Sequence, residues 1–162
     1  MSQKLTLIIQ PYQSRLELER SANKKGGRIF FKHFFILEDK CFPTNNWTDL
    51  SAAVLDMWIE CLLNENNQDQ ILHFMDGNFA LKLTSVNGSI YKVRFGISNE
   101  EKFIESSLFP SLMIGKDEFK NEVISAANVV IDLLKELNLN EDDYYLNRLI
   151  IQVEKFLQTH LL

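Results

Sequence analysis

The stretch FALKLTSVNGSIYKVRFGI (residues 79–97) decides the fold, because it predicts two strands joined by a short turn. Apolar and polar residues alternate on both sides of the Asn-Gly dipeptide, which is the period of a half-buried strand. A two-residue turn at Asn-Gly would pair Leu83 with Lys92 and mix the two faces. A three-residue loop over 86–88, with Gly88 left-handed, pairs Leu83 with Tyr91 and keeps the faces separate. We therefore predict the longer loop.

Apolar runs before this hairpin predict three further strands. Residues 4–10 form a short run that ends at Pro11, and residues 28–37 are apolar on both faces, which is typical of a strand in the middle of a sheet. A third run, 71–75, ends at Asp76-Gly77, a pair typical of a turn. The segment 13–27 is polar and predicts no regular element.

A helix is predicted over 47–63, with Asn46 as its N-terminal cap. Its apolar residues recur at intervals of three and four, so one side should face the core. The predicted core side consists of Leu50, Val54, Met57, Trp58, Cys61 and Leu62. Asp49, Asp56 and Glu60 are predicted on the opposite side, in solvent.

Two more helices are predicted at the C-terminal end, over 119–137 and 141–157, with Asn140 as the cap of the second. Their short connection predicts an antiparallel hairpin packed across one face of the sheet. Residues 1–162 are therefore expected to form a single α+β domain. It should contain an antiparallel sheet of about five strands, one helix between strands, and the C-terminal helix hairpin.

Negative charge is concentrated in the middle of the chain. Between Cys41 and Leu81 there are six carboxylates and neither lysine nor arginine, namely Asp49, Asp56, Glu60, Glu65, Asp69 and Asp76. One interpretation is an ordinary solvated face. The other is a surface that binds a basic partner, because like charges on one face repel each other without helping the protein to fold.

Composition narrows the classes of function. The net charge is −5, which disfavours nucleic acid as a partner, although residues 1–35 carry seven bases against two acids. The basic residues at 24–25, followed by two glycines, are interpreted as a solvated loop. No signal peptide or membrane span is evident, so we expect a cytoplasmic protein. Its two cysteines, Cys41 and Cys61, are then expected to be reduced and buried.

The sequence offers little for catalysis or metal binding. His33 and His73 lie in predicted strands and can be metal ligands if the strands bring them together, but an ordinary structural imidazole is the favoured interpretation because a third ligand is missing. Cys41 with His33 lacks the motif of a nucleophilic pair. Glycines are scattered, which disfavours a phosphate loop. We predict a non-enzymatic protein without catalytic residues, metal or cofactor.

Three short segments resemble small bacterial immunity proteins of polymorphic toxin systems, including the contact-dependent growth inhibition type. They are Cys41-Phe42-Pro43, then Trp47-Thr48-Asp49-Leu50, and Phe74-Met75-Asp76-Gly77-Asn78-Phe79. The resemblance covers about residues 28–97. It implies a cytosolic protein that binds one cognate toxin domain, often a nuclease, and blocks it without catalysis.

The acidic run is compatible with that function, because a nuclease face that holds phosphate is basic and attracts an acidic inhibitor. The six carboxylates listed above are the predicted contacts. An alternative from another class is an acidic secretion chaperone that holds an unfolded effector segment, which requires an exposed apolar groove or sheet edge. A small enzyme is a third alternative.

Overall fold

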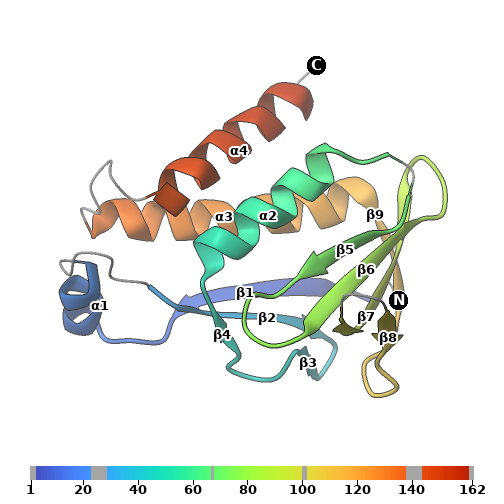
Figure 1. The fold of residues 1–162 in the computed structure, drawn as a ribbon, viewed down its shortest axis with the longest axis horizontal. Helices are drawn as coiled ribbons and strands as arrows, with labels where there is room; N and C mark the ends of the chain where they lie inside the picture. The colour runs from blue at the N-terminus through green and yellow to red at the C-terminus, as the bar shows by residue number, and fades with distance from the viewer. Residues whose placement is uncertain (1–2, 23–28, 67, 100–101, 138–143, 161–162) are drawn as a thin grey trace.

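A computed structural model of the chain describes residues 3–22, 29–66, 68–99, 102–137 and 144–160. It confirms the α+β class, with antiparallel strands, a helix between strands and a pair of C-terminal helices. The described strands divide between two sheets of four and five strands, in place of the single sheet of about five that was expected (Figure 1). Three of the predicted strands lie in the five-stranded sheet, and the strands near 4–10 and 28–37 lie in the other. The predicted loop at 24–27 and the cap at Asn140 lie outside the described residues.

The first sheet is built around β2 (Phe31–Leu37), the strand predicted to be central. Its neighbour on one side is β1 (Leu5–Pro11), paired along its whole length. Two short strands, β3 (Lys40–Phe42) and β4 (Thr48–Asp49), share the other side of β2. That edge of the sheet is therefore interrupted between β3 and β4.

The second sheet is built around β6 (Phe79–Ser85) and β7 (Ile90–Ser98), with β5 (Gln70–His73) beside β6. Two short strands, β8 (Phe103–Glu105) and β9 (Leu112–Gly115), pair with different parts of β7. They occupy the same edge one after the other, so this edge is also interrupted.

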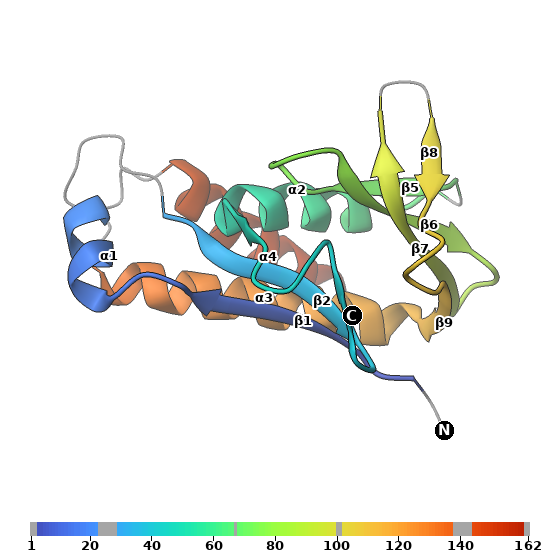
Figure 2. The same ribbon diagram turned by 90° about the horizontal axis from the view of Figure 1, so that it is seen from below.

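The helices gather on one side of the first sheet. They are α2 (Ser51–Leu63), α3 (Lys116–Glu136) and α4 (Tyr144–His160). Seen from below, β1 and β2 lie in front of them (Figure 2), while α3 and α4 run antiparallel, as predicted. Helix α3 packs on β1 of this sheet, where the Glu122 carboxylate accepts the Leu7 N–H at 2.8 Å, and α4 packs mainly on α2.

A fourth helix, α1 (Arg15–Ala22), forms in the polar segment where no element was predicted. Ser14 and Glu17 bond each other's backbone at its start, since the Ser14 N–H donates to the Glu17 carboxylate and the Glu17 N–H to the Ser14 hydroxyl. This reciprocal capping stabilises a short helix without much apolar burial. Among the described helices, none has the length and apolar composition that a membrane crossing requires.

The β6–β7 hairpin has the predicted faces, but its register is shifted by two residues. Leu83 pairs with Val93, in place of the predicted Leu83–Tyr91 pair. The loop comprises 87–89, and Gly88 lacks the predicted left-handed conformation. The Asn87 side chain accepts the Ser89 N–H at 2.8 Å and closes the turn instead. A two-residue shift preserves parity, so the same side chains still face the core.

The start of α2 was predicted too early. Residues 48–49 pair with β2 as a strand, Asn46 has a φ of 63°, and Leu50 takes the N-cap position without a side-chain bond. The buried side of the helix also differs from the predicted one. Asp56 is buried, whereas Met57 is exposed.

One core joins both sheets and the helices. Phe35 of β2 is fully buried and lies at its centre. Its ring centroid lies 5.7 Å from that of Trp58 on α2, 5.9 Å from Phe95 on β7 and 6.4 Å from Phe119 on α3. The two sheets therefore belong to one folded unit.

Candidate partner-binding surface

Asp49, a predicted partner contact, is buried and has a structural role. Its carboxylate accepts the N–H groups of Leu50, at 2.8 Å, and of Met75, at 3.0 Å. Burial raises the pKa of Asp49, and these hydrogen bonds oppose that effect. The side chain thus fastens the 75–78 turn to β4, and its predicted exposure is wrong.

Asp56 was also predicted in solvent, but it forms a buried ion pair with α4. The Arg148 Nε lies 2.8 Å from Asp56 Oδ2, and another guanidinium nitrogen lies 3.7 Å from the Glu60 carboxylate. The hydrogen bond to Asp56 raises the pKa of Arg148 further above its ordinary value. Glu60 itself stays exposed, with half of its side-chain surface in solvent.

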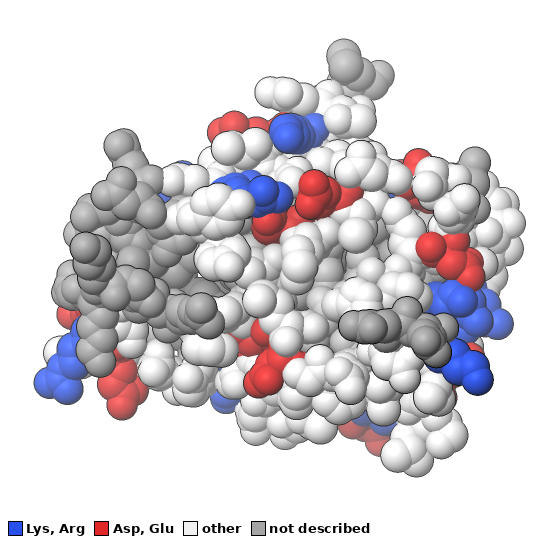
Figure 3. All heavy atoms as spheres, viewed as in Figure 1, with Lys and Arg blue, Asp and Glu red and all other residues white. Residues whose placement is uncertain are grey.

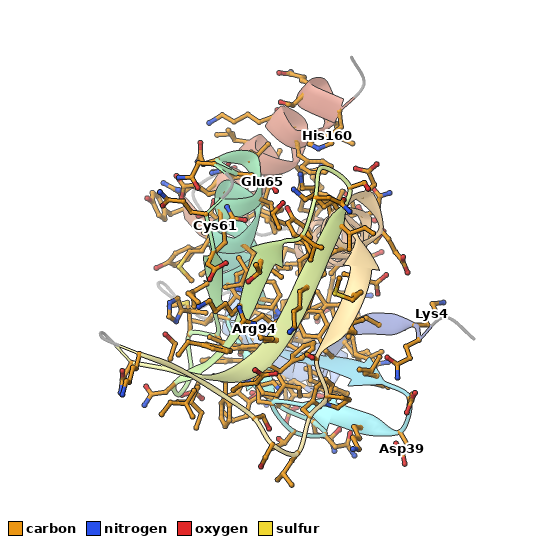
Figure 4. The ribbon with its side chains drawn as sticks, turned by 90° about the vertical axis from the view of Figure 1, so that its right-hand side faces the viewer. Lys4, Asp39, Cys61, Glu65, Arg94 and His160 are labelled. Atoms are coloured by element: carbon orange, nitrogen blue, oxygen red, sulfur yellow. The ribbon has the colours of Figure 1, made fainter. Side chains whose placement is uncertain are left out.

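Glu65 takes part in a compact charged cluster just beyond the end of α2 (Figure 4). It pairs with Lys116 and Lys120 of α3, and the Tyr91 hydroxyl of β7 donates to it at 2.9 Å. Burial raises the pKa of Glu65, but the hydrogen bonds from both lysines and Tyr91 outweigh it and bring the pKa to about 2. Burial and the neighbouring carboxylate raise the pKa of Tyr91.

The remaining two predicted contacts lie nearer to solvent. Asp69 sits 3.0 Å from Lys82, and a hydrogen bond from that lysine lowers its pKa. Asp76 is exposed and, within the described ranges, lies outside every ion pair.

The expectation of a free acidic face over 41–81 is therefore wrong. Of the six carboxylates, four pair with lysine or arginine and one is buried in a backbone hydrogen-bond network. Figure 3 shows acidic and basic side chains side by side over α2 and α4. The partners Lys116, Lys120 and Arg148 lie 51 to 92 residues further along the chain. No local spacing in the sequence indicates them.

The two strand histidines do not meet. His33 is fully buried, with Nδ1 2.8 Å from the Ser51 hydroxyl and its ring against Trp58, while His73 is exposed on the outer face of the second sheet. Burial lowers the pKa of His33 to about 3. Among the described residues no group of three metal-ligating side chains is found. His33 is therefore a structural imidazole.

The exposed part of the α2–α4 pair forms a different kind of surface, which we call the α2–α4 surface. It consists of Met57, Glu60, Tyr144, Arg148 and Ile151. Arg148 joins the two helices, and the Tyr144 hydroxyl lies 3.3 Å from its guanidinium. In Figure 3 most of the face over these helices is uncharged. Methionine, tyrosine and arginine are the side chains that protein interfaces favour.

The three segments that resemble immunity proteins meet in space. Phe42 lies 6.0 Å from Phe74 and 5.8 Å from Phe79, measured between ring centroids, and Trp47 lies 5.0 Å from Phe79. Together with Asp49 they form one packed corner, so these motifs specify local structure.

Comparisons of the chain with protein-family models, with curated proteins and with solved structures gave no match.

Proposed function

We propose that this protein binds a cognate bacterial toxin domain in the cytoplasm and neutralises it without catalysis. The resemblance over residues 28–97 supports the class of function, and the net charge of −5 supports a basic partner. A free acidic face does not support it, because most of the carboxylates predicted as contacts are paired or hydrogen-bonded within the chain. The binding surface proposed in its place is the α2–α4 surface, together with the exposed Asp76.

The observation that carries this proposal is the exposure of large side chains on two neighbouring helices. Tyr144 is 63% exposed and Ile151 49% exposed, and both lie on the same stripe of α4. Met57 is exposed on α2, one turn from Glu60. An apolar centre with a carboxylate beside it fits a partner that presents apolar side chains and a basic rim.

The test begins with the reading frame immediately upstream of this gene, because toxin and immunity genes are expected together. The C-terminal domain that it encodes is purified and its affinity for this protein is measured by calorimetry. Tyr144→Ala should weaken binding by about tenfold or more, as truncation of a buried interface aromatic does. Glu60→Lys should slow association and reduce its dependence on salt.

Matched controls lie on α3, away from the proposed surface. Asp132→Lys makes the same charge change at another exposed position, and Val129→Ala truncates another exposed apolar side chain. Both should leave the affinity unchanged. Equal effects of Glu60→Lys and Asp132→Lys would contradict the surface. A homodimer by light scattering that binds an extended effector segment would favour the secretion chaperone instead.

A further inference from the structure

A pocket of about 700 Å³ lies on the outer face of the second sheet, away from the α2–α4 surface. It is lined by side chains from β5, β6 and the β7–β8 hairpin, namely Ile71, His73, Asn78, Lys82, Ser98, Asn99, Lys102 and Phe103. Figure 4 turns this face of the sheet towards the viewer, with Arg94 labelled on it. The volume is within the range of small-molecule sites.

The described residues of the lining include positively charged and neutral polar side chains. They are two lysines, a histidine, two amides and a hydroxyl. Asp69 partly neutralises Lys82 from outside the pocket, at 3.0 Å.

The strand register explains why these groups converge. Ile71 is opposite Lys82, and His73 is opposite Ala80, so β5 and β6 present a lysine and a histidine on the same outer face. At the far end Ser98 is opposite Phe103, next to Lys102. The positive groups therefore come from both sides of the pocket, with Ile71 and Phe103 as apolar walls.

This arrangement suits a phosphate. Lysines bind phosphates as point charges, and neutral donors at several angles can share the three oxygens of a phosphate monoester. The apolar walls leave room for the organic part of such a ligand.

We propose that this pocket binds a small organic phosphate monoester, with Lys82 and Lys102 as the principal contacts to the phosphate and Phe103 against the organic part. The proposal is independent of toxin binding, because it uses a different face of the protein.

Binding is tested with adenosine monophosphate, adenosine and inorganic phosphate, followed by amide chemical shifts in two-dimensional NMR spectra. Adenosine monophosphate should cause saturable shifts at Lys82, Ser98 and Phe103, and inorganic phosphate weaker shifts at the same amides. Adenosine should cause none. Lys102→Gln and Lys82→Gln should each weaken binding by about tenfold, the loss expected for one charge-assisted hydrogen bond.

Lys92→Gln is the matched control, because Lys92 is an exposed lysine on the same sheet face but outside the pocket. It should leave binding unchanged. Shifts that do not saturate, or an equal effect of Lys92→Gln, would overturn the proposal. Thermal melts check that each variant is folded.

Discussion

His33 and Ser51 bond to each other in full burial, where β2 meets the first turn of α2. A neutral imidazole can occupy this position, because Nδ1 has the Ser51 hydroxyl as its partner. A charged imidazole cannot be solvated there, and His33 Nε2 has no hydrogen-bond partner in the structure. Protonation of this one side chain is therefore coupled to unfolding.

The first prediction concerns pH. The pKa of His33 is about 3 in the folded protein, whereas an unfolded histidine has a pKa of about 6.5. The unfolded state therefore binds more protons, and stability must fall as the pH decreases from about 6.5 towards 3. Between pH 7 and pH 4 the loss should be about 3 kcal/mol. Urea unfolding of the wild type and of His33→Gln, which cannot titrate, measures the difference; identical pH profiles would contradict the prediction.

Glu65 provides the second prediction. Its cluster with Lys116, Lys120 and Tyr91 ties the end of α2 to α3 and β7. Glu65→Gln should reduce the free energy of unfolding by about 2–3 kcal/mol at pH 7, because two buried lysines lose their counter-charge.

The pH dependence of this effect follows from the folded pKa of about 2. Since that value is below the unfolded one, the stabilisation is present above pH 4.5 and is lost as the pH falls towards 2. The difference between wild type and Glu65→Gln should shrink over this range in chemical unfolding. A difference that stays constant with pH would contradict the charged nature of the cluster.

At the scale of elements, β8 approaches β7 so closely that position 96 must be glycine. A Cβ at Gly96 would collide with the Ile104 carbonyl oxygen, whereas a Cβ at Gly88 would meet nothing within 4 Å. Gly96→Ala should therefore separate β8 from β7 and cost more than about 2 kcal/mol, while Gly88→Ala should change stability by less than about 0.5 kcal/mol. Thermal unfolding of both variants measures the stability, and amide exchange of Ser106, whose N–H donates to the Phe95 carbonyl oxygen at 2.7 Å, reports the separation of β8 from β7. Equal stability of the two variants would refute the close approach.

Elements with a clear period were predictable from the sequence, and their exact alignment was not. The alternation over 79–97 determines which side chains face the core, but the register depends on Asn87, whose side chain closes the turn. Likewise the apolar period of α2 predicts a helix, whereas its start depends on residues 48–49 pairing with β2. Tertiary pairing overrode the local capping signal at Asn46.

The candidate site was less predictable than the fold. A run of acids without lysine is visible in the sequence, but its neutralisation depends on chain segments that only folding brings close. Arg148 is 92 residues from Asp56. The pocket on the second sheet was equally hard to predict, since Lys82 lies on β6 and Lys102 lies just before β8. The sequence shows which charges are neighbours along the chain, but the ion pairs depend on which segments the fold brings together.

On the scale of the whole molecule, the core makes the two sheets depend on each other. Phe35 contacts Trp58, Phe95 and Phe119, which belong to three different elements. Phe35→Ala should cost about 3–5 kcal/mol, the loss for a fully buried phenylalanine. Both sheets should still unfold together in one transition, observed by circular dichroism and by tryptophan fluorescence. Separate transitions for the two signals would contradict a shared core.

Each sheet also ends in edges that offer another chain little to pair with. One edge of each is divided between two short strands, β3 with β4 and β8 with β9. The opposite edge of the second sheet is β5, which is only four residues long. The opposite edge of the first sheet is β1, where the Leu7 N–H already donates to the Glu122 carboxylate. In a protein with twelve phenylalanines, these short or interrupted edges reduce the backbone that another chain could pair with in an amyloid-like stack.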